Sequence, residues 1–115
     1  DHPRTVSAQP SVWGDVVVGR RDVPASYHVA VVIDDALQGV TDVIRGMDLF
    51  EATSLHRLLQ EMLDLPVPCY HHHKLILDAE SRKLAKSEKS QSLRGQRVQG
   101  VTAEEIRARL GLLPA

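Results

Sequence analysis

The sequence predicts an α/β domain, on two observations. Apolar runs rich in β-branched residues and separated by polar turns fill the first part of the chain, a pattern typical of strands. After residue 50 the apolar residues instead recur every three or four positions, which is the period of a helix. Strands that are interleaved with helices in this way indicate an α/β fold.

Four strands are expected, at residues 15–20, 27–33, 40–45 and 74–77. β-branched residues dominate the first two of them. The second, YHVAVVI, is almost continuously apolar, which suits a strand buried on both faces of a parallel or mixed sheet. Residues 34–39 form a polar connection to the third strand.

A first helix is expected after the third strand. Its apolar stripe has helical spacing and consists of Leu55, Leu58, Leu59, Met62 and Leu63. Thr53 or Ser54 can cap its start, and Pro66 and Pro68 lie beyond its end.

A second helix is expected near the end of the chain, at residues 103–110. Thr102 and Glu105 have the spacing of a capping box at its start, and Gly111 follows its end. A polar stretch that is rich in lysine and serine leads up to Gly100.

Composition narrows the class of protein. The chain has 115 residues, 43% apolar and 25% charged, which is typical of one soluble globular domain. The longest apolar run, residues 29–33, is too short to cross a membrane. Four aromatic residues are too few for a platform that stacks single-stranded nucleic acid. The one cysteine, Cys69, permits no internal disulfide and fits the cytoplasm.

The formal net charge of −1 hides an asymmetry along the chain. Residues 1–81 contain six Lys/Arg and twelve Asp/Glu, whereas residues 82–115 contain eight Lys/Arg and three Glu. The basic segment could face the phosphates of a nucleotide or of RNA. It could equally be a solvated surface, and charge alone leaves both interpretations open.

A pair of lysines is the first candidate for chemistry. Lys83 and Lys86 lie three residues apart in the sequence KLAKS, just after the fourth expected strand and its turn. Two cations in one loop can stabilise the negative charge that develops on a leaving pyrophosphate. A solvated lysine-rich loop is the alternative.

Tyr27 and Arg45 are the second candidate, since each lies at the end of an expected strand. Ligands of open α/β sheets bind at strand ends. An arginine can hold a carboxylate through paired N–H donors, and a tyrosine hydroxyl can hold another polar group. A surface salt bridge, for example with Asp48, is the alternative role for Arg45.

Two further clusters invite a metal interpretation, which we do not adopt. In the tract Cys69–His73 (CYHHH), adjacent residues of an extended chain point to opposite faces, so of the three histidines at most His71 and His73 share a side. A zinc site needs three or four converging ligands. Polar residues leading into the fourth strand are the simpler interpretation. For Asp34 and Asp35, turn chemistry explains the residues as well as Mg²⁺ does.

Four segments follow one another along the chain, SYHVAVVIDD at residues 26–35, GVTDVIRGMDL at 39–49, LIL at 75–77 and KLAKS at 83–87. Their order resembles that of the glutamyl-tRNA synthetase family of class I. The last of them resembles the KMSKS signature, with Ala85 in place of its middle serine. The resemblance covers about residues 12–95, in one order and with family-like spacing.

The resemblance implies a fold and a set of roles. Residues 1–78 would be the C-terminal half of a Rossmann-like catalytic domain, and residues 79–115 would carry the KMSKS-type loop and a basic helical tail. Tyr27 and Arg45 would bind L-glutamate. Lys86 would bind ATP, which is supplied with Mg²⁺, and would stabilise the departing pyrophosphate. Lys83 would support Lys86 in this role. The HIGH signature and the family's zinc site lie in an upstream half that this chain lacks, so we expect the chain to be inactive alone. Apolar surface left uncovered on the chain would favour self-association.

Two features favour the short members of the family, which lack an anticodon-binding domain and pass glutamate to the queuosine base of tRNA(Asp). Val31 stands where ordinary members often have Asn, and only 28 residues follow Ser87. An ordinary glutamyl-tRNA synthetase is the first alternative. A non-catalytic module that binds nucleotide or RNA is the second.

Overall fold

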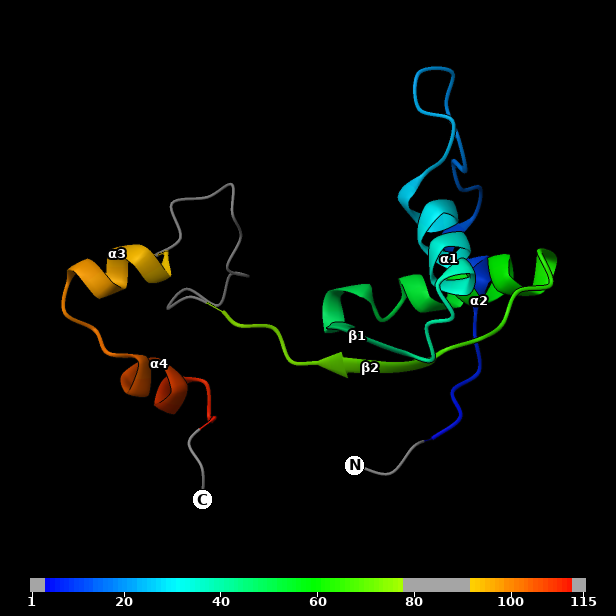
Figure 1. Cartoon of the computed structure of the whole chain (residues 1–115). Helices are drawn as coiled ribbons and strands as arrows, with labels where there is room; N and C mark the ends of the chain where they lie inside the picture. The colour runs from blue at the N-terminus through cyan, green and yellow to red at the C-terminus, as the bar shows by residue number, and fades with distance from the viewer. Residues whose placement is uncertain (1–3, 78–91, 113–115) are drawn as a thin grey trace. The chain divides into compact units, whose positions relative to one another are not determined.

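The computed structural model describes residues 4–77 and 92–112. The KLAKS loop, with Lys83 and Lys86, therefore lies outside the described residues, as does the turn expected after the fourth strand. The chain divides into two compact units, Asp1–Lys74 and Leu75–Ala115, and each is described by itself. Figure 1 labels their elements along the chain. No described helix combines the length and the apolar character that crossing a bilayer requires.

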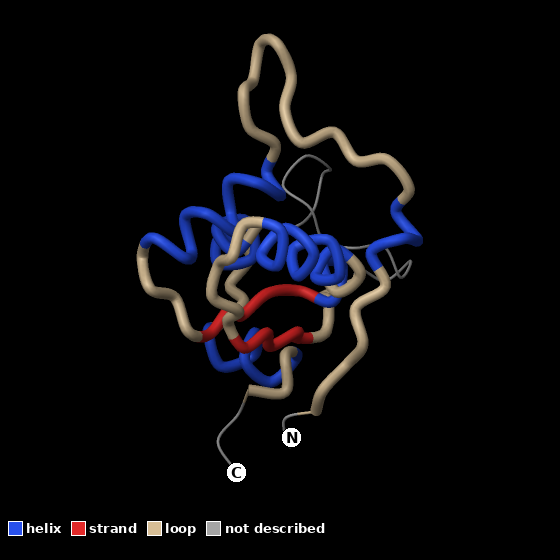
Figure 2. The backbone as a smooth tube through the Cα atoms, turned by 90° about the vertical axis from the view of Figure 1, so that its right-hand side faces the viewer, coloured by secondary structure: helices blue, strands red, loops and turns tan. Residues whose placement is uncertain are grey.

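The centre of the first unit is a strand–helix–strand motif. Strand β1 (Asp42–Gly46) is followed by helix α2 (Ala52–Met62) and then by strand β2 (Cys69–His73). The two strands lie side by side, as Figure 2 shows. They pair in parallel, with Asp42 opposite Cys69. A parallel pair needs a crossover of this kind, because the chain must return to the same end of the sheet. The predicted α/β arrangement is thus present in this unit.

Helix α1 (Tyr27–Leu37) packs against α2 and closes the small apolar core. Val32 of α1 is only 2% exposed and contacts the buried Leu55 and Leu59 of α2. Further apolar side chains are partly buried around this cluster, namely Val16, Val29, Val31, Ile33 and Leu65. Burial of this kind contributes about 1.5–3 kcal/mol for each fully buried aliphatic side chain.

The expected strand at residues 27–33 is wrong, because these residues begin helix α1. Ser26 caps the helix, with its Oγ accepting a hydrogen bond from the Val29 amide at 3.4 Å. Val29, Val32 and Ile33 then fall on one helical face, toward the core. The polar connection expected at residues 34–39 is wrong for the same reason, since α1 continues through Asp34 and Asp35 to Leu37.

Two other expected strands are not where the sequence predicted them. Residues 15–20 pair with no strand among the described residues; a loop closes there through a hydrogen bond from the Ser26 amide to the Val18 carbonyl at 2.8 Å. The fourth strand comes earlier, at Cys69–His73 rather than at 74–77. Parallel pairing with β1 selects this register, because it turns the alternate residues Tyr70 and His72 toward α2.

The third strand and the first helix are confirmed in position. β1 occupies Asp42–Gly46 and overlaps the expected range 40–45, shifted toward the C-terminus. Helix α2 begins at Ala52 with Glu51 as its N-cap and no capping side chain, so neither Thr53 nor Ser54 caps it. Its buried face also differs from the expected stripe, whose members Leu58, Met62 and Leu63 are exposed.

The second unit contains two short helices, α3 (Leu93–Val98) and α4 (Ala103–Arg109). Helix α3 was not expected; Ser92 caps it by accepting a hydrogen bond from the Gly95 amide at 3.0 Å. The capping box of α4 is confirmed, because Thr102 and Glu105 each accept a hydrogen bond from the other's amide.

Replacing Thr102 by alanine should destabilise α4 by about 1 kcal/mol, because the Glu105 amide loses its acceptor. Hydrogen exchange of the Ile106 amide, measured by NMR, should then speed up by about fivefold. Thr102→Ser keeps the accepting oxygen and should leave exchange unchanged. Equal exchange in the alanine and serine variants would contradict the stabilising role of the box.

Candidate functional site

Arg45 is the centre of a polar network beneath helix α2. It lies near the carboxyl end of β1, on the face turned to the helix, and is only 9% exposed. Its Nη1 donates to Nδ1 of His56 at 2.9 Å, and its Nε donates to Nε2 of His72 at 3.3 Å. Its Nη2 donates to Oγ1 of Thr53. Three partners from two elements therefore fix the plane of the guanidinium group.

These hydrogen bonds determine where the protons lie. An arginine only donates, so Nδ1 of His56 must accept and its proton sits on Nε2. That Nε2 then donates to Nδ1 of His28 at 2.9 Å. Nε2 of His72 accepts in the same way, which places the proton of the neutral ring on Nδ1. Each of the three histidines thus has an assigned tautomer.

The pKa values of the two histidines next to Arg45 support these neutral forms. His56 is completely buried, and burial, the positive charge of Arg45 and His28 together lower its pKa to about 4. Burial, Arg45 and His73 also lower the pKa of His72. Both rings therefore remain neutral acceptors for Arg45 at neutral pH.

An aromatic ring lies against the guanidinium group of Arg45. Cζ of Arg45 lies 4.6 Å from the centre of the Tyr70 ring, a cation–π contact. The Tyr70 hydroxyl accepts a hydrogen bond from Nε2 of Gln60 at 2.8 Å, and burial raises the pKa of this hydroxyl. The arginine is therefore held by hydrogen bonds in its plane and by a ring above it.

Tyr27 joins the same site from helix α1. Its ring packs edge-on against His28 at 5.5 Å and against His56 at 6.0 Å, and the side chain is half exposed. Tyr27 and Arg45 thus meet one histidine, His56. The sequence argument placed both at strand ends; this is right for Arg45 and wrong for Tyr27, which begins a helix.

Sequence analysis missed the residues that hold Arg45 in place. Thr53, His56 and Gln60 recur at helical spacing along α2, next to the buried Leu55 and Leu59. A row of polar residues at helical spacing, next to the row of buried leucines, was the signal in the sequence for a buried polar face on this helix. The interpretation of the tract at 69–73 as a lead into a strand is wrong, because the tract is β2 itself.

A large open pocket lies beside this network. It has a volume of about 1120 Å³ and is lined by Thr53, Tyr70 and His72 together with residues 4–9 and Trp13. Neither Arg45 nor Tyr27 lines it. The pocket and the arginine site therefore have Thr53, Tyr70 and His72 in common, but Arg45 itself lies outside the pocket lining.

The comparison with known families decides what the chain is. The model for the catalytic domain of class I tRNA synthetases (E and Q) matches residues 4–112. The chain belongs to this family. The resemblance inferred from the sequence is thereby confirmed. The parallel β1–α2–β2 motif lies within the residues that match this class I synthetase catalytic domain.

Curated relatives in this family are similar over most of the chain. A glutamyl-Q tRNA(Asp) synthetase of Rhodobacter capsulatus is 52% identical over 99 residues, which is 86% of this chain and 36% of that protein. Another, of Pseudomonas syringae, is 46% identical over 95 residues, 83% of this chain and 32% of that protein. This class I synthetase chain thus spans about a third of the length of these relatives.

Solved structures agree with the family. A glutamate-tRNA synthetase of Elizabethkingia anophelis has a TM-score of 0.56 at 34% identity, over 76% of this chain and 16% of that one. A glutamate tRNA ligase of Elizabethkingia meningosepticum, in complex with its amino acid, has a TM-score of 0.53 at 30% identity, over 73% and 16%.

Proposed function

We propose that this chain is the part of an ATP-dependent glutamate-activating ligase that holds the amino acid and the leaving pyrophosphate. One observation carries the proposal: Arg45 is fixed by Thr53, His56 and His72 in a chain of the E and Q class I family. An arginine oriented by three partners is suited to recognise a carboxylate of fixed direction.

Arg45 has the donors that this role needs. Its three bonds to described residues engage three of the five N–H groups of a guanidinium, which leaves two for a substrate carboxylate. Tyr27 is half exposed at the same histidine, so its hydroxyl is accessible to a second polar group of glutamate. We assign both residues to glutamate binding.

We assign the nucleotide to the loop with Lys83 and Lys86. Glutamate and ATP would form glutamyl-adenylate and pyrophosphate, with ATP entering as its Mg²⁺ complex. Lys86 would stabilise the charge on the departing pyrophosphate, and Lys83 would support it. Ala85 removes one hydroxyl from the KMSKS-type loop but keeps both lysines.

The acceptor that we propose is the queuosine base of tRNA(Asp), in the cytoplasm. The supporting observation is that the similar curated proteins are named glutamyl-Q tRNA(Asp) synthetases, at 43–52% identity for three of them. Transfer to the tRNA of an ordinary glutamyl-tRNA synthetase is the second candidate, because the similar solved structures are glutamate-tRNA ligases.

A chimera tests the proposal directly. The matching 99 residues of the Rhodobacter capsulatus relative would be replaced by those of this chain, and glutamate-dependent ATP–pyrophosphate exchange would be measured without tRNA. We expect exchange in the chimera and none with the 115-residue chain alone. Lys86→Ala should reduce exchange by at least about 100-fold, whereas the control Lys74→Ala should not change it.

The other outcomes separate the alternatives. Exchange that requires tRNA(Glu) would favour an ordinary glutamyl-tRNA synthetase. No exchange under either condition, in a chimera shown to be folded by circular dichroism, would contradict the catalytic role. Exchange by the isolated 115-residue chain would contradict the proposal that this chain is inactive alone.

A further inference from the structure

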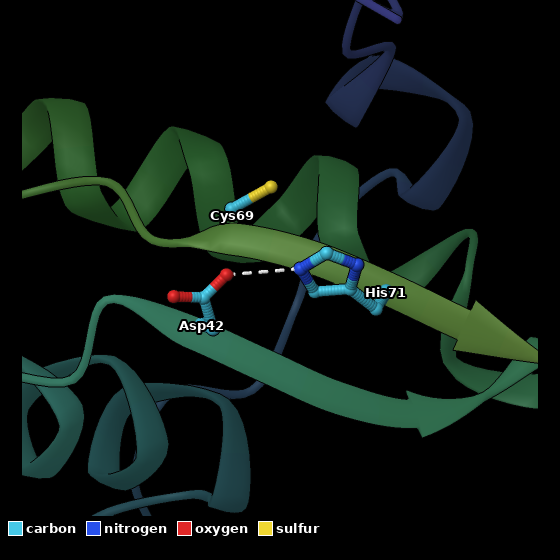
Figure 3. Close-up of side chains that lie close together, drawn as sticks. All are labelled: Asp42, Cys69 and His71. Atoms are coloured by element: carbon cyan, nitrogen blue, oxygen red, sulfur yellow. Dashed lines mark hydrogen bonds and ion pairs between the residues drawn. The ribbon is translucent and has the colours of Figure 1, made fainter. Parts of the chain in front are cut away.

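The sheet carries a second cluster of side chains, on the face opposite Arg45. Alternation along a strand turns Tyr70 and His72 toward α2 and leaves Cys69 and His71 on the other face. The parallel register pairs Asp42 of β1 with Cys69 of β2. Figure 3 shows Asp42, Cys69 and His71 close together on the two strands.

The possible ligand atoms of these three side chains lie close together. The carboxylate oxygen of Asp42, the Sγ of Cys69 and a ring nitrogen of His71 all lie within 4.8 Å of one another. Oδ1 of Asp42 and Nε2 of His71 are 2.9 Å apart. The Thr41 hydroxyl donates to Oδ2 of Asp42 at 2.9 Å and so orients the carboxylate. All three ligand residues are exposed, which leaves the cluster open to an ion from solution.

We propose that Asp42, Cys69 and His71 form a three-ligand site for Zn²⁺ or a similar transition-metal dication, with water as the fourth ligand. A thiolate, an imidazole and a carboxylate are the ligands that zinc takes in proteins. Mg²⁺ and Ca²⁺ prefer sites made of oxygen alone, so the sulfur and the nitrogen select against them.

The proton balance of binding follows from the hydrogen bonds. Nε2 of His71 faces a carboxylate oxygen, so it carries the proton of that bond. The metal takes the place of this proton, which moves to Nδ1 of the neutral ring. The Cys69 thiol loses its proton to solvent, because the thiolate is the ligand. Thr41 continues to hold Oδ2 of Asp42, the usual role of a residue behind a metal ligand.

Cobalt titration of the 115-residue chain tests this site. Cys69 is the only cysteine, so a thiolate-to-cobalt charge-transfer band in the near ultraviolet reports that residue alone. We expect the band to saturate at one Co²⁺ per chain, with tetrahedral bands in the visible region, and to disappear when Zn²⁺ is added. Asp42→Asn and His71→Gln should each weaken binding by at least about tenfold.

His73 supplies the matched control. It lies two residues beyond His71 on the same exposed face of β2 but outside the cluster. His73→Gln should leave the cobalt affinity unchanged. Circular dichroism verifies that each variant is folded, which exposed positions permit.

Three results would overturn the site. The first is no charge-transfer band at saturating Co²⁺. The second is a band whose affinity is unaffected by Asp42→Asn and His71→Gln, or reduced as much by His73→Gln. The third is half an ion per chain with dimers in sedimentation, which would mean that two thiolates from two chains hold the metal.

Discussion

Replacing Arg45 by leucine is expected to lower the free energy of unfolding by about 3 kcal/mol or more, because three acceptors lose a hydrogen-bond donor at about 1–3 kcal/mol each. The substitution leaves Nδ1 of His56, Nε2 of His72 and Oγ1 of Thr53 without the donor that each now has. His56 is completely buried, so water cannot replace that donor without rearrangement. Urea unfolding of the 115-residue chain, followed by circular dichroism, measures the change.

Arg20 provides the control for this experiment. Among the described residues its side chain pairs only with its near neighbour Asp22, at 3.4 Å, and both side chains are largely exposed. Arg20→Leu should therefore change stability by less than about 0.5 kcal/mol. A loss for Arg45→Leu that is no larger than this would show that the network around Arg45 contributes nothing to the fold.

Arg45→Lys separates folding from substrate binding. A lysine retains the charge but is a point donor, and it cannot reach three acceptors in one plane as a guanidinium does. In the chimera we expect the KM for glutamate to rise by at least about tenfold, with the midpoint of unfolding less affected than in Arg45→Leu. An unchanged KM would contradict glutamate binding by Arg45 and leave its structural role intact.

The parts of the fold that could be predicted depend on signals that are local in sequence. The capping box of Thr102 and Glu105 involves residues three positions apart, and it specified α4. Alternation over a few residues located β1. Residues 27–33 could not be assigned in this way, since a short apolar run fits a buried strand and a buried helix equally well. Ser26 was the local signal for the helix, through its bond to the Val29 amide.

The site was harder to predict because its residues meet only through pairing and packing. Arg45 and His56 lie on different elements, and the contact between them exists because α2 crosses over the face of β1 that carries Arg45. Asp42 and Cys69 are neighbours only because the strands pair in parallel with this register. A shift of one residue would turn Cys69 and His71 to the other face. Sequence could therefore nominate Arg45 and Tyr27 but not the groups around them.

Acid is expected to destabilise the first unit well above the pH at which carboxylates titrate. In the folded chain His56 has a pKa of about 4, against 6.5 for an ordinary histidine. Between these values the unfolded chain binds more protons than the folded one, so stability falls as pH falls. The loss from His56 alone approaches about 3 kcal/mol near pH 4 and levels off below it. Urea midpoints measured from pH 7.5 to pH 4 should show this decline.

His56→Gln isolates the histidine from the other titrating groups. A glutamine can accept from Arg45 through its oxygen and donate toward His28 through its nitrogen, without a titrating proton. The decline between pH 6.5 and pH 4 should shrink accordingly. His72, whose pKa is also lowered, accounts for part of what remains. The lowered pKa values of Asp42 and Glu105 act in a lower window, because a carboxylate with a depressed pKa loses its contribution only as pH falls toward and below about 4. An identical decline in both chains would mean that His56 accepts a proton without loss of the Arg45 network, and the assignment of His56 as a neutral acceptor would then be wrong.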